Sequence, residues 1–181
     1  MGNIYFTSDL HFGHYNIIKY DERPFWSVEE MDAELIKNWN EKVQLNDTVY
    51  ILGDISWYGK EHTAEILDQL NGSKILIRGN HDAVCMKLQD RFAEIHDYKE
   101  IEVDGTPLVL CHYPIPLFNR HYYGAYMLYG HVHRSHEWVM TERYKEELQQ
   151  KGIPCNMVNV GTMHWNYAPV TLKDILSAER K

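Results

Sequence analysis

Five short apolar segments of the chain, each typical of a buried β-strand, are followed at once by Asp, His or Asn. The polar residues after them are Asp9 and His11, Asp54, Asn80 and His81, His112, and His131 and His133. In open α/β sheets, ligands bind in the crevice beyond the carboxyl ends of the strands. Five polar clusters at five such ends are therefore placed to converge on one spot.

The first half of the sequence predicts strands that alternate with helices. Strands are expected at residues 3–8, 48–52 and 74–77. Three helices are expected: one that begins after Ser27, one over residues 60–70, and a short one that begins near Ala83. Ser27 and Glu30 form a capping box, and apolar residues follow it at helical spacing. This alternation is typical of parallel strands covered by helices.

The second half of the sequence predicts a hairpin, because Asp104-Gly105 is a turn signal between two strand-like segments. The expected elements are strands at residues 98–103, 107–110, 125–129 and 157–160, and a C-terminal helix capped by Thr171 with Asp174. The charged stretch from Thr141 to Lys151 is either an exposed helix or an insertion. Together the halves indicate an α/β fold with two mixed β-sheets and helices outside.

Composition narrows the class of protein. A length of 181 residues without repeats fits a single domain over residues 1–181. The sequence shows no apolar run that would span a membrane and no signal peptide, so a cytoplasmic location is expected. Three cysteines without a C-x-x-C motif argue against a disulfide framework or a cysteine zinc site. The net charge of -8 argues against a nucleic-acid partner.

The residue types in the polar clusters suit divalent metal ions. Asp supplies charge, neutral His supplies nitrogen, and Asn supplies a carbonyl oxygen. In an extended backbone, Asp-x-His and His-x-His place both side chains on the same side. Gly53, Gly79 and Gly130 each precede a candidate ligand. Glycine allows a sharp turn and a close approach of the backbone to a ligand.

The clusters together resemble a known family. Asp9-x-His11, Gly53-Asp54, Gly79-Asn80-His81-Asp82, His112 and Gly130-His131-x-His133 are similar in order and spacing to the motifs of the calcineurin-like metallophosphoesterases. The resemblance covers most of the chain. It implies two mixed β-sheets packed as a sandwich and flanked by helices, in an α-β-β-α arrangement.

The resemblance also implies a role for each residue. Asp9, His11 and His133 would bind one metal ion, Asn80, His112 and His131 would bind a second, and Asp54 would bridge both. His81 would face the substrate as the general acid, with Asp82 orienting its ring. This agrees with the expectation that the neighbours Asn80 and His81 point opposite ways in an extended segment.

The implied reaction is hydrolysis of a phosphate ester by a metal-bridging hydroxide. The two ions would be Mn²⁺, Fe, Zn²⁺, Ni²⁺ or Co²⁺, all of which suit mixed nitrogen and oxygen ligands. A phosphodiester of a small molecule or nucleotide is the expected substrate. The alternatives are a phosphomonoesterase, a nuclease, and a metal-binding scaffold without catalysis. The sequence does not indicate an oligomeric state.

Other residues keep two interpretations each. His14, Arg23 and the ligand Asn80 are candidate contacts to substrate phosphate. His14 could instead assist the metal ligands or lie in a solvated loop, and Arg23 could be a surface charge beside two acids. The aromatic segment 118–129 either lines a pocket that stacks a nucleobase or packs in the core. His164 lies in a loop near the end of the family pattern, where its relation to the site is open.

Overall fold

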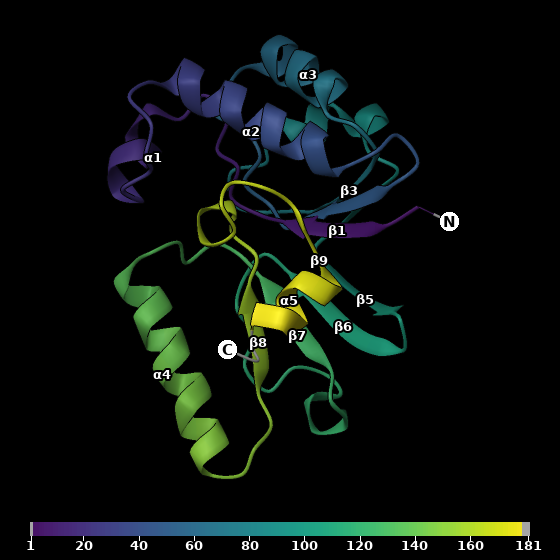
Figure 1. Cartoon of the computed structure of the whole chain (residues 1–181), viewed down its shortest axis with the longest axis vertical. Coiled ribbons are helices and arrows are strands. Elements are labelled where there is room, and N and C mark those ends of the chain that lie inside the picture. Colours follow the sequence, from purple (N-terminus) through teal and green to yellow (C-terminus); the bar gives the residue numbers. More distant parts are fainter. Residues whose placement is uncertain (1, 179–181) are drawn as a thin grey trace.

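The computed structural model describes residues 2–178, which form two mixed β-sheets packed against each other with helices outside (Figure 1). The α/β fold with two mixed sheets is therefore confirmed. The ends of the predicted domain, Met1 and residues 179–181, lie outside the described residues.

The larger sheet has five strands in the order β4-β3-β2-β1-β9. They are β1 (Ile4–Thr7), β2 (Thr48–Ile51), β3 (Ser73–Ile77), β4 (Glu94–His96) and β9 (Val170–Thr171). Strands β1 to β4 run parallel, and β9 pairs with β1 in the antiparallel sense. Because β1, β2 and β3 are parallel neighbours, their carboxyl ends lie at the same edge of the sheet.

The smaller sheet has four strands in the order β5-β6-β7-β8. They are β5 (Tyr98–Val103), β6 (Thr106–Cys111), β7 (Tyr126–Tyr129) and β8 (Asn156–Asn159). The predicted hairpin joins β5 to β6, and its turn residues Asp104 and Gly105 both have positive φ, at 49° and 76°. This conformation suits a type I′ turn. The remaining strands of this sheet pair in parallel.

Helices cover both outer faces (Figure 1). Helices α2 (Val28–Lys42) and α3 (Lys60–Gln69) lie over the larger sheet, and α4 (His136–Gln150) lies beside the smaller one. Two shorter helices are α1 (Tyr15–Tyr20) and α5 (Leu172–Ala178). Within residues 2–178, no helix is both long and apolar enough to cross a membrane.

The strands separate the apolar core into layers, because successive side chains of a strand point to opposite faces. On β2, Val49 packs with residues of α2 and α3, whereas Tyr50 joins the cluster between the sheets. On β6, Leu110 belongs to the cluster between the sheets, and Val109 belongs to the cluster that contains Leu148 of α4. The strands are thus buried on both faces, which leaves their ends as the natural place for polar groups.

Both predicted helix caps have their N-cap hydrogen bond, but only the cap at α5 is reciprocal as in a capping box. Ser27 Oγ accepts the Glu30 N–H at 3.2 Å, although the Glu30 carboxylate accepts the N–H of Trp26 rather than that of Ser27. At α5, Thr171 Oγ1 accepts the Asp174 N–H at 3.2 Å, and Asp174 Oδ2 accepts the Thr171 N–H at 2.9 Å. These reciprocal bonds satisfy donors that have no partner inside a helix.

Some elements differ from the prediction. The charged stretch is an exposed helix, but it belongs to α4, which begins earlier at His136 and buries only Leu148. The helix expected near Ala83 is replaced by two 3₁₀ turns, Cys85–Lys87 and Gln89–Arg91. Helix α1 and strands β4 and β9 were not predicted, because each is short and lacks a clear periodic pattern.

Candidate metal centre

The seven predicted metal ligands lie on the loops that follow β1, β2, β3, β6 and β7. The two sheets meet at this edge. Ser8, after β1, pairs with Gly161, after β8, in an isolated parallel bridge. The His131 N–H donates to the Asp9 carboxylate at 3.1 Å. The predicted convergence of strand ends from both halves of the chain is therefore present.

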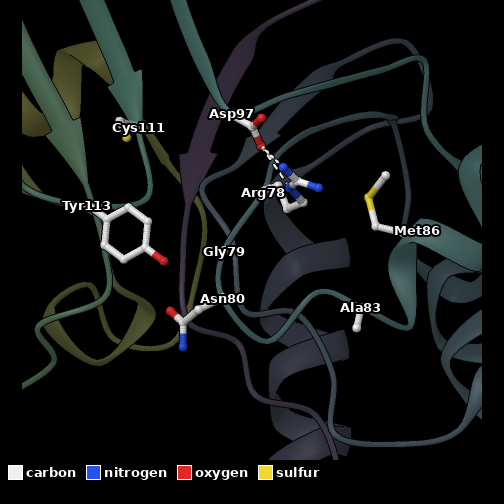
Figure 2. Close-up of a pocket in the computed structure, with 8 residues that line it drawn as sticks. All are labelled: Arg78, Gly79, Asn80, Ala83, Met86, Asp97, Cys111 and Tyr113. Carbon is white, nitrogen blue, oxygen red and sulfur yellow. Dashed lines mark hydrogen bonds and ion pairs between the residues drawn. The ribbon is translucent and has the colours of Figure 1, made fainter.

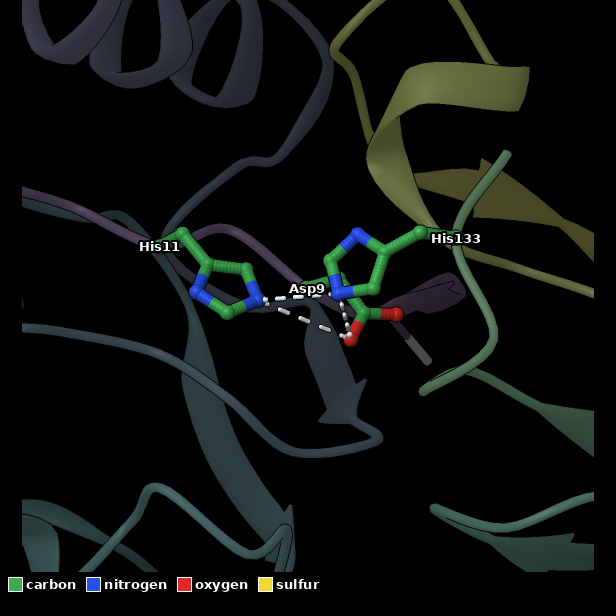
Figure 3. A group of neighbouring side chains, drawn as sticks. All are labelled: Asp9, His11 and His133. Atoms are coloured by element: carbon green, nitrogen blue, oxygen red, sulfur yellow. Dashed lines mark hydrogen bonds and ion pairs between the residues drawn. The ribbon is translucent and has the colours of Figure 1, made fainter. Parts of the chain in front are cut away.

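Asp9, His11 and His133 form the first group of closely spaced ligand atoms (Figure 3). The Nε2 atoms of His11 and His133 are 3.3 Å apart. They lie 3.9 Å and 3.6 Å, respectively, from Asp9 Oδ1. Ligand atoms bound to one ion at about 2.1 Å are about 3.0–3.5 Å from one another. The three side chains thus surround a position that suits one divalent ion after small shifts.

Asp54 and His112 form the second group together with Asp9. Asp54 Oδ2 lies 3.6 Å from His112 Nε2 and 3.8 Å from His11 Nε2. Asn80 adds a carbonyl oxygen, since its Oδ1 is 3.0 Å from His112 Nε2. One carboxylate oxygen of Asp54 therefore lies between a histidine of the first group and a histidine of the second.

The other ring nitrogens of two ligand histidines are held by the protein. His112 Nδ1 donates to the Leu52 carbonyl at 2.7 Å, and His133 Nδ1 donates to Asp21 Oδ2 at 3.0 Å. A hydrogen bond at Nδ1 fixes the tautomer and leaves Nε2 free to bind a metal ion. The Nε2 atoms of both rings are therefore oriented by hydrogen bonds within the protein.

Asp21 is a residue that the sequence analysis missed, and it is held by Arg23. The Arg23 Nε and Nη2 atoms donate to Asp21 Oδ2 at 3.2 Å and 3.1 Å. Arg23 Nη2 also donates to the Asp9 carbonyl at 2.9 Å, and Nη1 donates to the Leu10 carbonyl at 3.0 Å. The Arg23 side chain is 0% exposed. Arg23 is therefore neither a surface charge nor placed to contact substrate phosphate, since its donors face the ligand loop from inside.

Five of the candidate ligands have a left-handed backbone. The φ angles are 55° at Asp9, 55° at His11, 57° at Asp54, 70° at His131 and 43° at His133. The expectation of an extended backbone in the Asp-x-His and His-x-His motifs is therefore wrong. Such conformations cost about 1–3 kcal/mol each and persist where the surroundings impose them. Here the first loop is bonded to the second, through Asp9 N–H to Gly53 O at 3.0 Å and His11 N–H to Asp54 O at 3.0 Å.

All three glycines that precede candidate ligands are required by space. A Cβ at Gly130 would lie 1.9 Å from Ser8 Oγ and 2.4 Å from Asp9 Oδ2. A Cβ at Gly53, whose φ is 89°, would lie 2.4 Å from His112 Nδ1, and a Cβ at Gly79 would lie 2.4 Å from Asp54 Oδ1. All these distances are far below van der Waals contact, so the close approach predicted for these glycines is confirmed.

Comparison with known proteins agrees with this geometry. The sequence profile of the calcineurin-like phosphoesterase superfamily domain matches residues 3–173. The chain belongs to this superfamily. The uncharacterised protein MJ1445 of Methanocaldococcus jannaschii is 38% identical over 183 residues, which cover 100% of this chain and 93% of that protein. The gene 66 protein of Mycobacterium phage D29 is 35% identical over 132 residues, which cover 63% of this chain and 65% of that protein.

A solved structure shares the fold of this calcineurin-like phosphoesterase along nearly its whole length. The crystal structure of AQ665, a protein of unknown function from Aquifex aeolicus, superposes with a TM-score of 0.75 at 28% identity. The match covers 98% of this chain and 100% of that chain. Family membership and the two groups of Asp and His ligands support a metal-dependent phosphoesterase.

The donor set of the phosphoesterase fits divalent ions electrostatically. Burial raises the pKa of the Asp9 carboxyl group, although His133 and His112 oppose this shift. Burial also lowers the pKa of His11 well below its usual value, so this imidazole is neutral and its nitrogen is available. For His133, burial acts to lower the pKa, but the Asp21 hydrogen bond and the Asp9 charge outweigh it and raise the pKa. A bound cation would offset the cost of the buried Asp9 charge.

His81 and Asp82 are neighbours in the chain, but His81 is exposed and Asp82 is buried. His81 is exposed, and its N–H donates to Asp54 Oδ1 at 2.9 Å. The Asp82 carboxylate is buried and accepts the N–H groups of Asp54, Ile55 and Gly79 at 2.7–3.0 Å. It holds the loop that carries Asp54, so the expectation that Asp82 orients the His81 ring is wrong. Residues 80–84 form a turn, which also corrects the expected extended segment.

His131 and His14 stand beside the two ligand groups. The His131 ring lies edge-on against the His112 ring, with centroids 5.0 Å apart, but its atoms belong to neither closely spaced group among the described residues. His14 Nδ1 is 3.3 Å from His11 Nδ1, and the His14 ring stacks on Trp57 at 4.0 Å. His14 therefore supports a ligand histidine and is not a freely solvated loop residue. Trp57 had no sequence signal and also lies 4.2 Å from the His81 ring.

The remaining candidates lie behind or beside the centre. Phe118 and Tyr129 are buried in the core, which agrees with core packing for part of the aromatic segment, whereas Tyr122 and Tyr123 are exposed. His164 packs near the Trp138 ring at 5.1 Å. Burial lowers the pKa of His164, and a hydrogen bond to the His133 backbone opposes this shift. His164 therefore lies behind the ligand loop.

Proposed function

We propose that this phosphoesterase hydrolyses a phosphodiester of a small molecule or nucleotide, with two divalent ions and His81 as general acid. The observation that carries the proposal is the position of Asp54 Oδ2, 3.8 Å from His11 Nε2 and 3.6 Å from His112 Nε2. A carboxylate oxygen between two ligand histidines supports a shared ligand at a site for two ions. Two-ion sites with such shared ligands suit the displacement of an oxygen at phosphorus.

The chain offers a ligand set for each ion. Asp9, His11 and His133 would hold the first, Asn80, His112 and a reoriented His131 would complete the second, and Asp54 would contact both. When bound, the ions would polarise the phosphoryl oxygens and lower the pKa of a water molecule that attacks phosphorus. Two divalent ions carry more positive charge than the carboxylates of Asp9 and Asp54 return. The pocket would therefore attract an anionic ester although the chain has a net charge of -8.

His81 is the proposed proton donor because it is exposed at the centre while its backbone is anchored. The N–H bond to Asp54 Oδ1 fixes its position relative to the shared ligand. The tilted contact with Trp57 limits the directions open to the ring. A histidine held in this way would donate a proton to the leaving oxygen, a step worth about 10²–10⁴-fold in rate.

The first experiment uses chelated protein reloaded with Mn²⁺ and compares bis-p-nitrophenyl phosphate with p-nitrophenyl phosphate. Metal-dependent turnover with preference for the diester supports the proposal. Preference for the monoester would replace it with a phosphomonoesterase. If the protein digests single-stranded DNA and hydrolyses neither nitrophenyl ester, a nuclease would be favoured. Bound metal without turnover of any of these substrates would favour a binding scaffold.

Two variants test the assigned roles. His81→Ala should keep its metal and lose most turnover of diesters with poor leaving groups, by about 10²-fold or more. His62→Ala is a matched control, because His62 is also exposed but stacks on Tyr58 outside the ligand groups. Asp54→Asn should reduce both metal content and turnover. Retention of two ions per chain by Asp54→Asn would show that Asp54 is not the shared ligand.

A further inference from the structure

A pocket of about 760 Å³ adjoins the second ligand group at Asn80 (Figure 2). Asn80 belongs to both, since it lines the pocket and its Oδ1 is 3.0 Å from His112 Nε2. The volume lies in the range of sites that enclose small organic ligands, about 300–1,000 Å³. A substrate whose phosphate sits at the ligand groups would extend its ester group into this pocket.

The pocket has one aromatic wall. Tyr113 lies on one side in Figure 2, and Met86 and Ala83 lie on the other, with Arg78, Gly79 and Asn80 between them in that view. Tyr113 is 43% exposed, and its ring packs edge to face with the His112 ring, with centroids 5.0 Å apart. An exposed aromatic ring in a pocket wall favours stacking of a planar aromatic group. The stacking surface considered for residues 118–129 is thus available at Tyr113.

The far part of the pocket carries both signs of charge. Arg78 Nε donates to Asp97 Oδ1 at 2.7 Å, and Arg78 Nη2 lies 2.7 Å from the same oxygen as an ion pair. The two side chains are 45% and 70% exposed, and an ion pair this exposed is weak and opens easily. The pair presents guanidinium donors and carboxylate acceptors side by side. The polar edge of a nucleobase carries both matching kinds of group.

We infer that this pocket binds the nucleoside part of a nucleotide ester, with the base against Tyr113 and its polar edge at Arg78 and Asp97. The inference rests on the proposed phosphodiesterase function and names its substrate class. A single nucleotide is favoured over a nucleic acid, because the net charge of -8 offers no general surface for a polyanion.

The test compares two diesters with the same leaving group on Mn²⁺-loaded protein. One is the p-nitrophenyl ester of thymidine 5′-monophosphate, and the other is methyl p-nitrophenyl phosphate, which lacks a nucleoside. Wild type should prefer the nucleotide ester in kcat/KM by at least about tenfold. Tyr113→Ala should reduce that preference by about 10-fold to 100-fold, as expected for loss of base stacking. Tyr113→Phe, which keeps the ring, should retain it.

Controls separate the pocket from general effects. Tyr123→Ala removes an exposed tyrosine that does not line the pocket and should leave the preference unchanged. Arg78→Ala should reduce the preference, whereas Arg91→Ala, which breaks an exposed ion pair with Asp68 outside the pocket, should not. Equal kcat/KM values for the two diesters in wild type would overturn the inference and leave the proposed phosphodiesterase intact.

Failure of the proposed function gives a different result. If wild type hydrolyses neither diester, thymidine 5′-monophosphate binding to the Mn²⁺-loaded protein is measured by calorimetry. Binding that is lost in Tyr113→Ala and kept in Tyr113→Phe would still support the nucleoside pocket. Equal binding by wild type and Tyr113→Ala, or no binding, would overturn it.

Discussion

Asp21→Asn should weaken binding of one metal ion and spare the other. Asp21 Oδ2 accepts three hydrogen bonds, one from His133 Nδ1 and two from Arg23. Asparagine keeps the shape but removes the charge, so the hydrogen bond that orients His133 becomes weaker. Mutation of such a partner typically lowers metal affinity by about 10–100-fold. This corresponds to about 1.4–2.8 kcal/mol.

The same variant also costs stability. Three hydrogen bonds to a charged acceptor become bonds to a neutral one, at about 1 kcal/mol each. A loss of about 3 kcal/mol leaves a chain folded when its total stability is about 5–15 kcal/mol. The metal-binding experiment is therefore feasible on folded protein.

The assay is titration of chelated protein with Mn²⁺ against a competing chelator, with denaturant unfolding measured in parallel. Asp47→Asn is the matched control, because Asp47 is also buried and accepts the N–H groups of Asn3 and Gln44, before β2 and away from the centre. Asp47→Asn should lose stability without losing metal affinity. Equal metal affinity in the two variants would refute the role assigned to Asp21.

Further predictions concern the loops around the centre and one helix cap. Asp82→Asn removes the charge that accepts three backbone N–H groups, and it should lower the unfolding free energy of chelated protein by about 2–4 kcal/mol in urea titrations. Gly130→Ala would place a Cβ 1.9 Å from Ser8 Oγ, so it should cost about 1–3 kcal/mol and reduce metal content in elemental analysis. Burial acts to raise the pKa of Asp174, but hydrogen bonds from Thr171 outweigh it and lower the pKa. Asp174→Ala should therefore lower the free energy of unfolding by about 1 kcal/mol at pH 6. This difference from wild type should vanish as the pH falls through the lowered pKa of Asp174 in the folded protein. Unfolding experiments at several acidic pH values would measure it.

The sequence was enough to predict most of the strands, the helix caps and the candidate ligands, because these depend on local signals. Apolar runs such as residues 48–52 form strands wherever both faces are covered, and Ser27 caps a helix through contacts three residues away. Because Asp9, Asp54 and His112 each follow such a strand, the sequence was enough to predict that their side chains lie close together. Parallel pairing then placed those strand ends at one edge.

Only the tertiary structure decided how the ligands are held. Asp21 and Arg23 look like surface charges in sequence, yet folding buries them under the first ligand loop, where they orient His133. Asp82 follows His81 directly, but its carboxylate is taken by backbone N–H groups of the loop after β2. The contacts of His133 with Asp21 and of Asp82 with the loop after β2 join residues 27 or more positions apart, and the ligand loops have a left-handed backbone that loop packing imposes. No local pattern encodes them, because their free energy arises from burial and from partners that only the folded chain brings together.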